Sequence, residues 1–235
     1  MEKNNSKIGI AEAMRIYNGC NPVIQTISIW SIATLIFLLW YIILRFVLGS
    51  TIGEIDQGDS EVVNGVSRTS FTMFMFFTSA VGNFIFQMQE FYKNSAGGKY
   101  FRSVTGGFDT YKMMKAGQLL QCICGQAFFA GIILLLNTVF HFVNSSLGVC
   151  ITVFLLSLIG TASGRLICMI ENLTAKSLSF FPLMGFYMLI CTVIVGVTDG
   201  RLTSVHIILL VLDVILLPIA HFIDLKNFRK YHWYE

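Results

Sequence analysis

The stretch IWSIATLIFLLWYIILRFVL, residues 29–48, is twenty residues long and carries one charged side chain, Arg45. A helix of about 20 mostly apolar residues is long enough to cross the hydrocarbon core of a bilayer. The composition of the whole chain points the same way. Of its 235 residues, 55% are hydrophobic and 12% are charged, whereas a soluble domain has about 25% charged residues. We therefore expect one integral membrane domain, residues 1–235, of the all-α class.

Five further stretches resemble this one in length and apolar content, so the sequence predicts six transmembrane helices. The shortest connection, VNSSLG at residues 143–148, separates the third from the fourth, and it favours a hairpin of two spans over one long span. The first 22 residues lack the apolar core and the cleavage site of a signal peptide. The expected limits of the spans are 26–48, 70–90, 117–142, 147–164, 178–197 and 204–223.

The distribution of lysine and arginine predicts the orientation of the spans, because these residues gather on the cytoplasmic side. With the N-terminus inside, only Arg45, Arg68 and Arg201 of the 16 basic residues fall on the outer side. We expect a multi-pass protein of a bacterial cell membrane with both termini in the cytoplasm. The net charge of +3 then reflects an inner face beside anionic lipid headgroups, with no nucleic acid as a partner.

The predicted cytoplasmic connection at 91–116 contains most of GGKYFRSVTGGFDTYKMMKAG, residues 97–117. Its Gly-Lys pair is not a phosphate-binding loop, because Lys99 is followed by Tyr100 and the upstream glycine of that motif is missing. Gly97 and Gly98 break the preceding helix, KYFRSV at 99–104 is long enough for a short helix, and residues 105–107 form a turn. We expect Asp109 to cap the next helix.

This short helix has two interpretations from the residues alone. Its aromatic and basic side chains suit a protein interface, and they equally suit an amphipathic loop that rests on lipid. The stretch at 8–18 is a candidate interfacial helix with Arg15 near the headgroups. Lys112 and Lys115, in the first turns of the third helix, are expected at the same headgroup level.

The chain resembles the permease subunits of ABC-2-type exporters. The resemblance rests on an amphipathic N-terminal stretch, six spans and a cytoplasmic helix between spans two and three. Its motif covers about 30 residues. A proline that is frequent after the arginine of that motif is replaced here by residues 104–106. The residues in comparable places are Glu90, Gly97 or Gly98, Arg102, Tyr111, Lys112 and Lys115.

The resemblance implies that residues 8–18 form the elbow helix and that a coupling helix docks in a cleft of a separate cytoplasmic ATPase. That partner would bind ATP and Mg²⁺, so this chain would be no enzyme and would hold no cofactor. A second permease copy, identical or different, would complete the transporter. The cargo would be amphipathic or hydrophobic, such as a bacteriocin or toxin peptide, for export or self-immunity. The residues implied in ATPase coupling are Gly98, Lys99, Tyr100, Phe101, Arg102, Ser103 and Val104.

Polar groups inside spans are expensive, and each is a candidate for function. Asn83, Gln87, Asn137 and Asp213 either line a translocation path or hydrogen-bond between packed helices. The run from Phe71 to Phe77, rich in aromatic residues and methionine, suits either a cargo path or a lipid-facing surface.

No motif of a metalloprotease, intramembrane protease or zinc site is present, and no catalytic or metal-binding residue is predicted. The alternative function is a stand-alone membrane immunity or sensor protein that binds a partner without transport.

Overall fold

The computed structural model describes residues 9–43, 46, 62–63, 66–91, 106–141, 146–170 and 172–231. Within these ranges the protein is helical apart from a two-stranded antiparallel pairing of Val62 with Ser67 and Val63 with Val66. The elements in chain order are α1 (Ile10–Asn18), α2 (Pro22–Ile43), β1 (Val62–Val63), β2 (Val66–Ser67), α4 (Arg68–Phe91), α6 (Gly107–Phe140), α7 (Ser146–Cys168), α8 (Leu173–Thr198) and α9 (Ser204–Tyr231).

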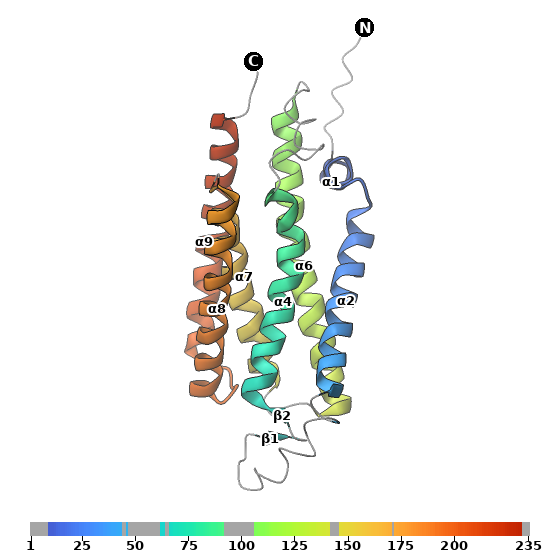
Figure 1. Ribbon diagram of the computed structural model, residues 1–235, viewed down its shortest axis with the longest axis vertical. Coiled ribbons are helices and arrows are strands. Elements are labelled where there is room, and N and C mark those ends of the chain that lie inside the picture. The colour runs from blue at the N-terminus through green and yellow to red at the C-terminus, as the bar shows by residue number, and fades with distance from the viewer. Residues whose placement is uncertain are drawn as a thin grey trace.

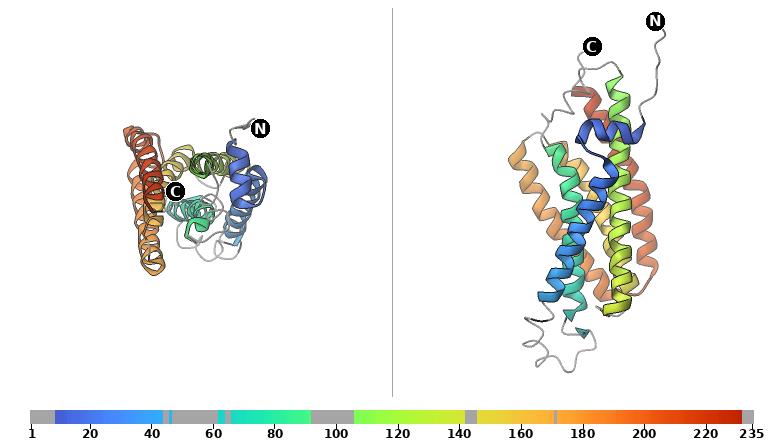
Figure 2. Two further views of the ribbon diagram at one scale, coloured as in Figure 1. Left: turned by 90° about the horizontal axis from the view of Figure 1, so that it is seen from above. Right: turned by 90° about the vertical axis from the view of Figure 1, so that its right-hand side faces the viewer.

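Six long helices, α2, α4, α6, α7, α8 and α9, form a bundle in which each runs antiparallel to the next (Figure 1). α1 lies across one end of the bundle, which we call the α1 end, and β1 and β2 lie at the opposite end, which we call the hairpin end. α4 packs against α2, α6, α7 and α8, and α7 packs against α4, α6, α8 and α9, so both are inner helices of the bundle (Figure 2).

Five of the long helices are long and apolar enough to cross a membrane. They are the segments Pro22–Ile43, Gly107–Phe140, Leu147–Ile167, Leu178–Thr198 and Ser204–Asn227. They coincide with five of the six spans predicted from the sequence. The predicted second span, 70–90, overlaps α4, whose side chains are described as far as Asn83.

α4 carries several polar side chains inside the bundle. Thr72, Thr78, Ser79 and Asn83 are all buried in the bundle. Two of these side chains are satisfied within the helix: the Thr72 hydroxyl donates to the carbonyl of Arg68, and the Thr78 hydroxyl donates to that of Phe74. An inner position lets α4 carry polar residues that an outer span does not tolerate.

The helix ends are set by local backbone chemistry. Gly19 closes α1 in the left-handed region with φ 71°, which glycine adopts without strain, and the Asn172 side chain caps α8 by accepting from two backbone amides. α6 begins at Gly107 after Gly106, whose φ is 76° and which provides no side-chain cap. Asp109 is therefore not the N-cap that we predicted. It lies in the first turn, where its carboxylate accepts from Lys112 at 2.8 Å.

An aromatic cluster holds α2, α4 and α6 together. Trp30 is fully buried, and its ring lies against Gly82 of α4 and Gly125 of α6. A Cβ on Gly125 would overlap the indole Nε1, so only glycine permits this approach. Phe37 continues the cluster, with edge-to-face contacts to Phe71 and Phe129 at centroid distances of 5.3 and 6.2 Å.

The run from Phe71 to Phe77 divides between the core and the outer surface of the bundle. Phe71, Met75 and Phe76 are buried, whereas Met73 and Phe77 are 37% and 47% exposed. The alternation follows from the helical period, which turns successive residues to different faces of α4. Phe71 and Met75 therefore pack the helices together, and Phe76 belongs to the same core and also lines a pocket between α4, α7 and α8.

Candidate functional site

The predicted coupling residues, Gly98 to Val104, lie outside the described residues. The structure does describe both flanks of that connection. α4 ends at Phe91 and α6 begins at Gly107, and both ends lie at the α1 end of the bundle (Figure 1). Any force applied to the connection thus reaches the bundle at the ends of these two helices.

α1 docks directly on the first turns of α6. Ala13 and Met14 are buried against Tyr111 and Met114, and together they form a small apolar cluster of their own. Gly117 permits this contact, because a Cβ at that position would overlap the Met14 sulfur. Sequence reasoning placed a helix at 8–18, and the structure adds its partner, the start of α6.

On another side of α6, Lys115 forms a buried ion pair with α9. Its Nζ lies 2.9 Å from Oδ2 of Asp224, and the two side chains are 3% and 12% exposed. The same ammonium lies 5.4 Å from the centre of the Tyr111 ring. This position differs from the headgroup contact expected for Lys115. The side chain turns inward because a carboxylate is available there and can compensate the buried charge.

Arg165 of α7 extends this charged cluster. Its Nη2 donates to the carbonyl of Lys115 at 3.3 Å, and its Nη1 lies 3.2 Å from Nδ1 of His221. A guanidinium group has no acceptor, so Nδ1 accepts and the ring proton of a neutral His221 is on Nε2. The charged cluster of Lys115, Arg165, His221 and Asp224 thus joins α6, α7 and α9 at the α1 end.

The other two predicted headgroup contacts lie nearer the surface. Arg15 is exposed on α1. Lys112 pairs with Asp109, and its Nζ lies 4.7 Å from the centre of the Phe108 ring. Arg229 of α9 approaches the same ring to 5.7 Å. Phe108 is therefore a second point of contact between α6 and α9, beside the buried ion pair.

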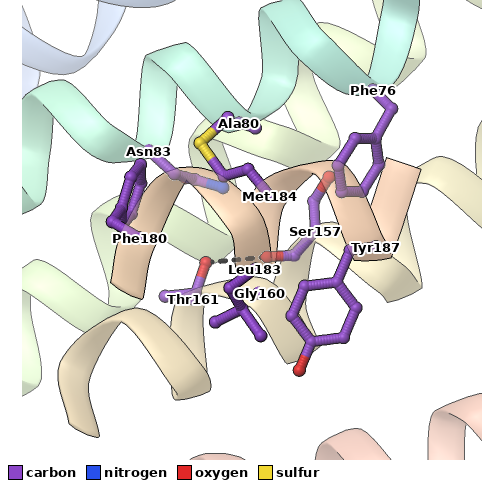
Figure 3. A pocket seen from close by; sticks show the side chains of 10 residues that line it. All are labelled: Phe76, Ala80, Asn83, Ser157, Gly160, Thr161, Phe180, Leu183, Met184 and Tyr187. Carbon is purple, nitrogen blue, oxygen red and sulfur yellow. Dashed lines mark hydrogen bonds between the residues drawn. The ribbon is translucent and has the colours of Figure 1, made fainter. Parts of the chain in front are cut away.

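A pocket lies between α4, α7 and α8, away from the charged cluster (Figure 3). Its volume is about 30 Å³, which is room for about two water molecules. Asn83 is 15 residues and Ser157 is 11 residues beyond the hairpin-end starts of their helices, so the pocket lies about 16–22 Å along the bundle. The lining residues are Phe76, Ala80, Asn83, Ser157, Gly160, Thr161, Phe180, Leu183, Met184 and Tyr187.

Two polar atoms at this pocket have no hydrogen-bond partner among the described residues, Oδ1 of Asn83 and Oγ of Ser157. Both residues are at most 5% exposed. By contrast, the Thr161 hydroxyl donates to the carbonyl of Ser157 at 2.9 Å and accepts from Gln126 at 3.3 Å. Tyr187 directs its hydroxyl to Ser163 at 2.7 Å. The Asn83 oxygen and the Ser157 hydroxyl are therefore free to form hydrogen bonds with a molecule inside the pocket.

Asp213 is buried in the first half of α9, and neither carboxyl oxygen has a hydrogen-bond partner among the described residues. Hydrogen bonding between packed helices was one expectation for these polar residues, and no described contact joins Asn83 or Asn137 to Asp213. His206 lies on the same face of α9, seven residues before Asp213, and it does have a hydrogen-bond partner. Its Nε2 lies 2.9 Å from the Thr152 hydroxyl.

The four polar residues predicted for a path or for packing are thus not gathered into one site. Asn83 lines the pocket, Asn137 lies near the hairpin end of α6, Asp213 lies in α9, and the side chain of Gln87 is outside the described part. Sequence reasoning missed Ser157, although the spacing of Ser157, Gly160 and Thr161 puts them on one face of a helix. In the described ranges no three His, Cys, Asp or Glu residues lie close enough to hold a metal ion.

Comparisons of the chain with protein-family models, with curated proteins and with solved structures found no match.

Proposed function

We propose that this chain is the membrane-spanning subunit of an ATP-driven exporter of the ABC-2 kind. The main support for the proposal is that the first turns of α6 are packed and bonded against three other helices. These turns follow the predicted coupling segment, and they are held by α1 on one side and by α9 and α7 on another. A push on the segment would therefore reach α1, α7 and α9 together.

The helix count and charge distribution support a transporter topology. With α4 taken as the sixth span, its 24 residues extend over about 36 Å, enough to cross the hydrocarbon core. Described basic residues at the hairpin end are Arg68 and Arg201. At the α1 end they are Arg15, Lys112, Lys115, Arg165, Lys176, Lys226, Arg229 and Lys230. This bias supports a cytoplasmic position for the α1 end.

α1 fits the role of an interfacial elbow helix. It lies across the bundle rather than along it (Figure 2), with Ala13 and Met14 inward and Arg15 exposed. A short helix in this orientation, with basic residues at headgroup depth, is anchored by both lipid and protein. In this proposal it holds the start of α6 at the membrane surface while the coupling segment moves.

α6 itself suits the transmission of movement into the membrane. It runs without a break from Gly107 to Phe140, 34 residues, or about 51 Å. That is about 20 Å more than the hydrocarbon core, so a rigid extension projects on the cytoplasmic side. ATP-driven closure of the partner ATPase would push on residues 98–104 and tilt this extension, and a second permease copy would form the other wall of the path.

The test is association with a nucleotide-binding ATPase encoded beside this chain. Changing Phe101 and Arg102 together to Asp is expected to abolish co-purification of that ATPase. The change replaces an apolar anchor and a cation of the predicted docking segment by two negative charges. The matched control changes Leu202 and Arg201 to Asp at the hairpin end, where both are exposed, and association is expected to persist.

Both variants must insert and elute as the parent chain does. Normal association of the Phe101→Asp, Arg102→Asp variant would show that the docking segment lies elsewhere. If the parent chain retained no ATPase, the exporter proposal would fail, and a stand-alone membrane binding protein would become the better account.

A further inference from the structure

We infer that the pocket between α4, α7 and α8 binds the uncharged hydrogen-bonding end, an amide or hydroxyl, of an amphipathic molecule. This inference rests on the proposed function only in naming that molecule as the class of cargo. The binding site itself is argued from the pocket and is tested without an ATPase.

The first argument is the cost of the unpartnered groups. Asn83 and Ser157 are 5% and 3% exposed, and each has a polar atom with no partner among the described residues. An unsatisfied buried polar group costs about 1–3 kcal/mol. At the depth of the pocket the surrounding lipid offers no donors or acceptors. Only internal water or a bound polar group can satisfy these atoms.

The second argument is the space in front of them. In Figure 3 the side chains of Asn83 and Ser157 come from α4 and α7 and meet the same cavity beside Met184. About 30 Å³ holds about two water molecules. A ligand amide has an N–H donor and a carbonyl acceptor. It can replace these waters, giving its N–H to the Asn83 oxygen and accepting from the Ser157 hydroxyl.

The third argument is the character of the remaining walls. Phe76, Phe180 and Leu183 supply apolar surface, and none of the ten lining residues is charged. Leu183, Met184 and Tyr187 are half-buried, so the pocket reaches the outer surface of the bundle between helices. The ligand class is therefore an uncharged polar group on an apolar body, which would enter from the lipid side.

Gly160 provides a variant that closes the pocket without disturbing the fold. A Cβ there would meet only Tyr187 Cδ2, at 3.9 Å, which is ordinary contact. Gly160→Ala also favours the helix, and Gly160→Val adds two more methyl groups to the cavity wall. The matched control is Gly196→Ala on α8, where a Cβ meets nothing within 4 Å and no pocket residue is involved.

The experiment uses the full chain alone in phosphatidylcholine nanodiscs. A decanamide carrying a diazirine on its alkyl chain is photolysed, and the labelled residues are identified by mass spectrometry. We expect label near Phe76–Asn83 and Phe180–Tyr187, competition by decanamide, and no competition by decane. Asn83→Leu is expected to weaken binding about 2- to 10-fold through one lost hydrogen bond. Gly160→Val should abolish the specific label, and Gly196→Ala should retain it.

Equal competition by decane, or label spread evenly over the exposed apolar faces, would show adventitious lipid-like binding and overturn the inference. Undiminished labelling in a correctly folded Gly160→Val variant would overturn it as well, and Gly160→Ala provides the milder version if Val impairs folding. The two proposals fail separately. Loss of ATPase association with intact labelling refutes only the exporter, and loss of labelling with intact association refutes only the pocket.

Discussion

The ion pair between Lys115 and Asp224 gives the sharpest prediction about what holds the α1 end together. Its atoms lie 2.9 Å apart, the two side chains are nearly buried, and Arg165 lies beside them through its bond to the Lys115 carbonyl. Among the described residues of this charged cluster, Asp224 is the single anion. Removing it leaves two buried cations without compensation, so Asp224→Asn is expected to cost about 3–5 kcal/mol of unfolding free energy.

Removing the lysine has a smaller expected cost, because Arg165 still supplies a cation to the charged cluster that contains Asp224. Lys115→Met keeps the long side chain and removes one charge, and we expect a loss of about 1–3 kcal/mol. The double variant Lys115→Met, Asp224→Leu is expected to change the free energy of unfolding by less than about 1 kcal/mol. An apolar pair of similar volume can often replace a buried ion pair at little cost.

The assay is unfolding of the four proteins in mixed micelles, followed by circular dichroism as the denaturing detergent fraction is raised. The double-mutant cycle should show a coupling energy above about 2 kcal/mol, well outside the additivity found for independent sites. Additive losses, or equal losses for the two single variants, would refute the reasoning. Such a result would mean that water at the headgroup level already screens this pair.

Three further changes test other contacts by the same unfolding assay. Gly125→Ala should lose about 1–3 kcal/mol because its Cβ overlaps the Trp30 ring in a packed core, whereas Gly131→Ala on the same helix, with open space around it, should be neutral or stabilising. Asp213→Leu should be neutral or stabilising, since it removes a buried carboxyl that has no described partner and would cost free energy if left unsatisfied; a loss above about 2 kcal/mol would contradict this and reveal a polar contact of Asp213. Gly117→Leu should displace α1, seen as faster protease cleavage within residues 9–21 with little change in bundle stability.

The sequence predicted the helices well because length and apolar content are local properties. The predicted first span at 26–48 overlaps α2, and two separate helices do meet near VNSSLG, since α6 ends at Phe140 and α7 begins at Ser146. The boundaries were less accurate at the α1 end. α6 begins at Gly107 rather than near 117, because its first ten residues are too polar to resemble a span yet still helical. Their stability comes from packing on α1 and α9, which no local pattern reveals.

Contacts between residues far apart in the chain could not be predicted from the sequence. Lys115 looked like a headgroup anchor because a lysine at a span end normally extends to the surface, and its partner Asp224 lies 109 positions away. Asn83 was identified as a polar residue inside a span, but its pocket required Ser157 from α7 and the α8 side chains around Met184. Local chemistry marks such residues as unusual, and only the fold shows which of them meet.

The central claim is that the connection before α6 receives a force from a partner ATPase and that α6 carries it into the bundle. Hydrogen–deuterium exchange on the chain, with and without the ATPase encoded beside it, tests this directly. We predict slower exchange of residues 98–117 when the ATPase and a non-hydrolysable nucleotide are present, with residues 198–204 at the hairpin end unchanged. Unchanged exchange in 98–117 with the ATPase bound elsewhere, or no binding of the ATPase, would contradict the account.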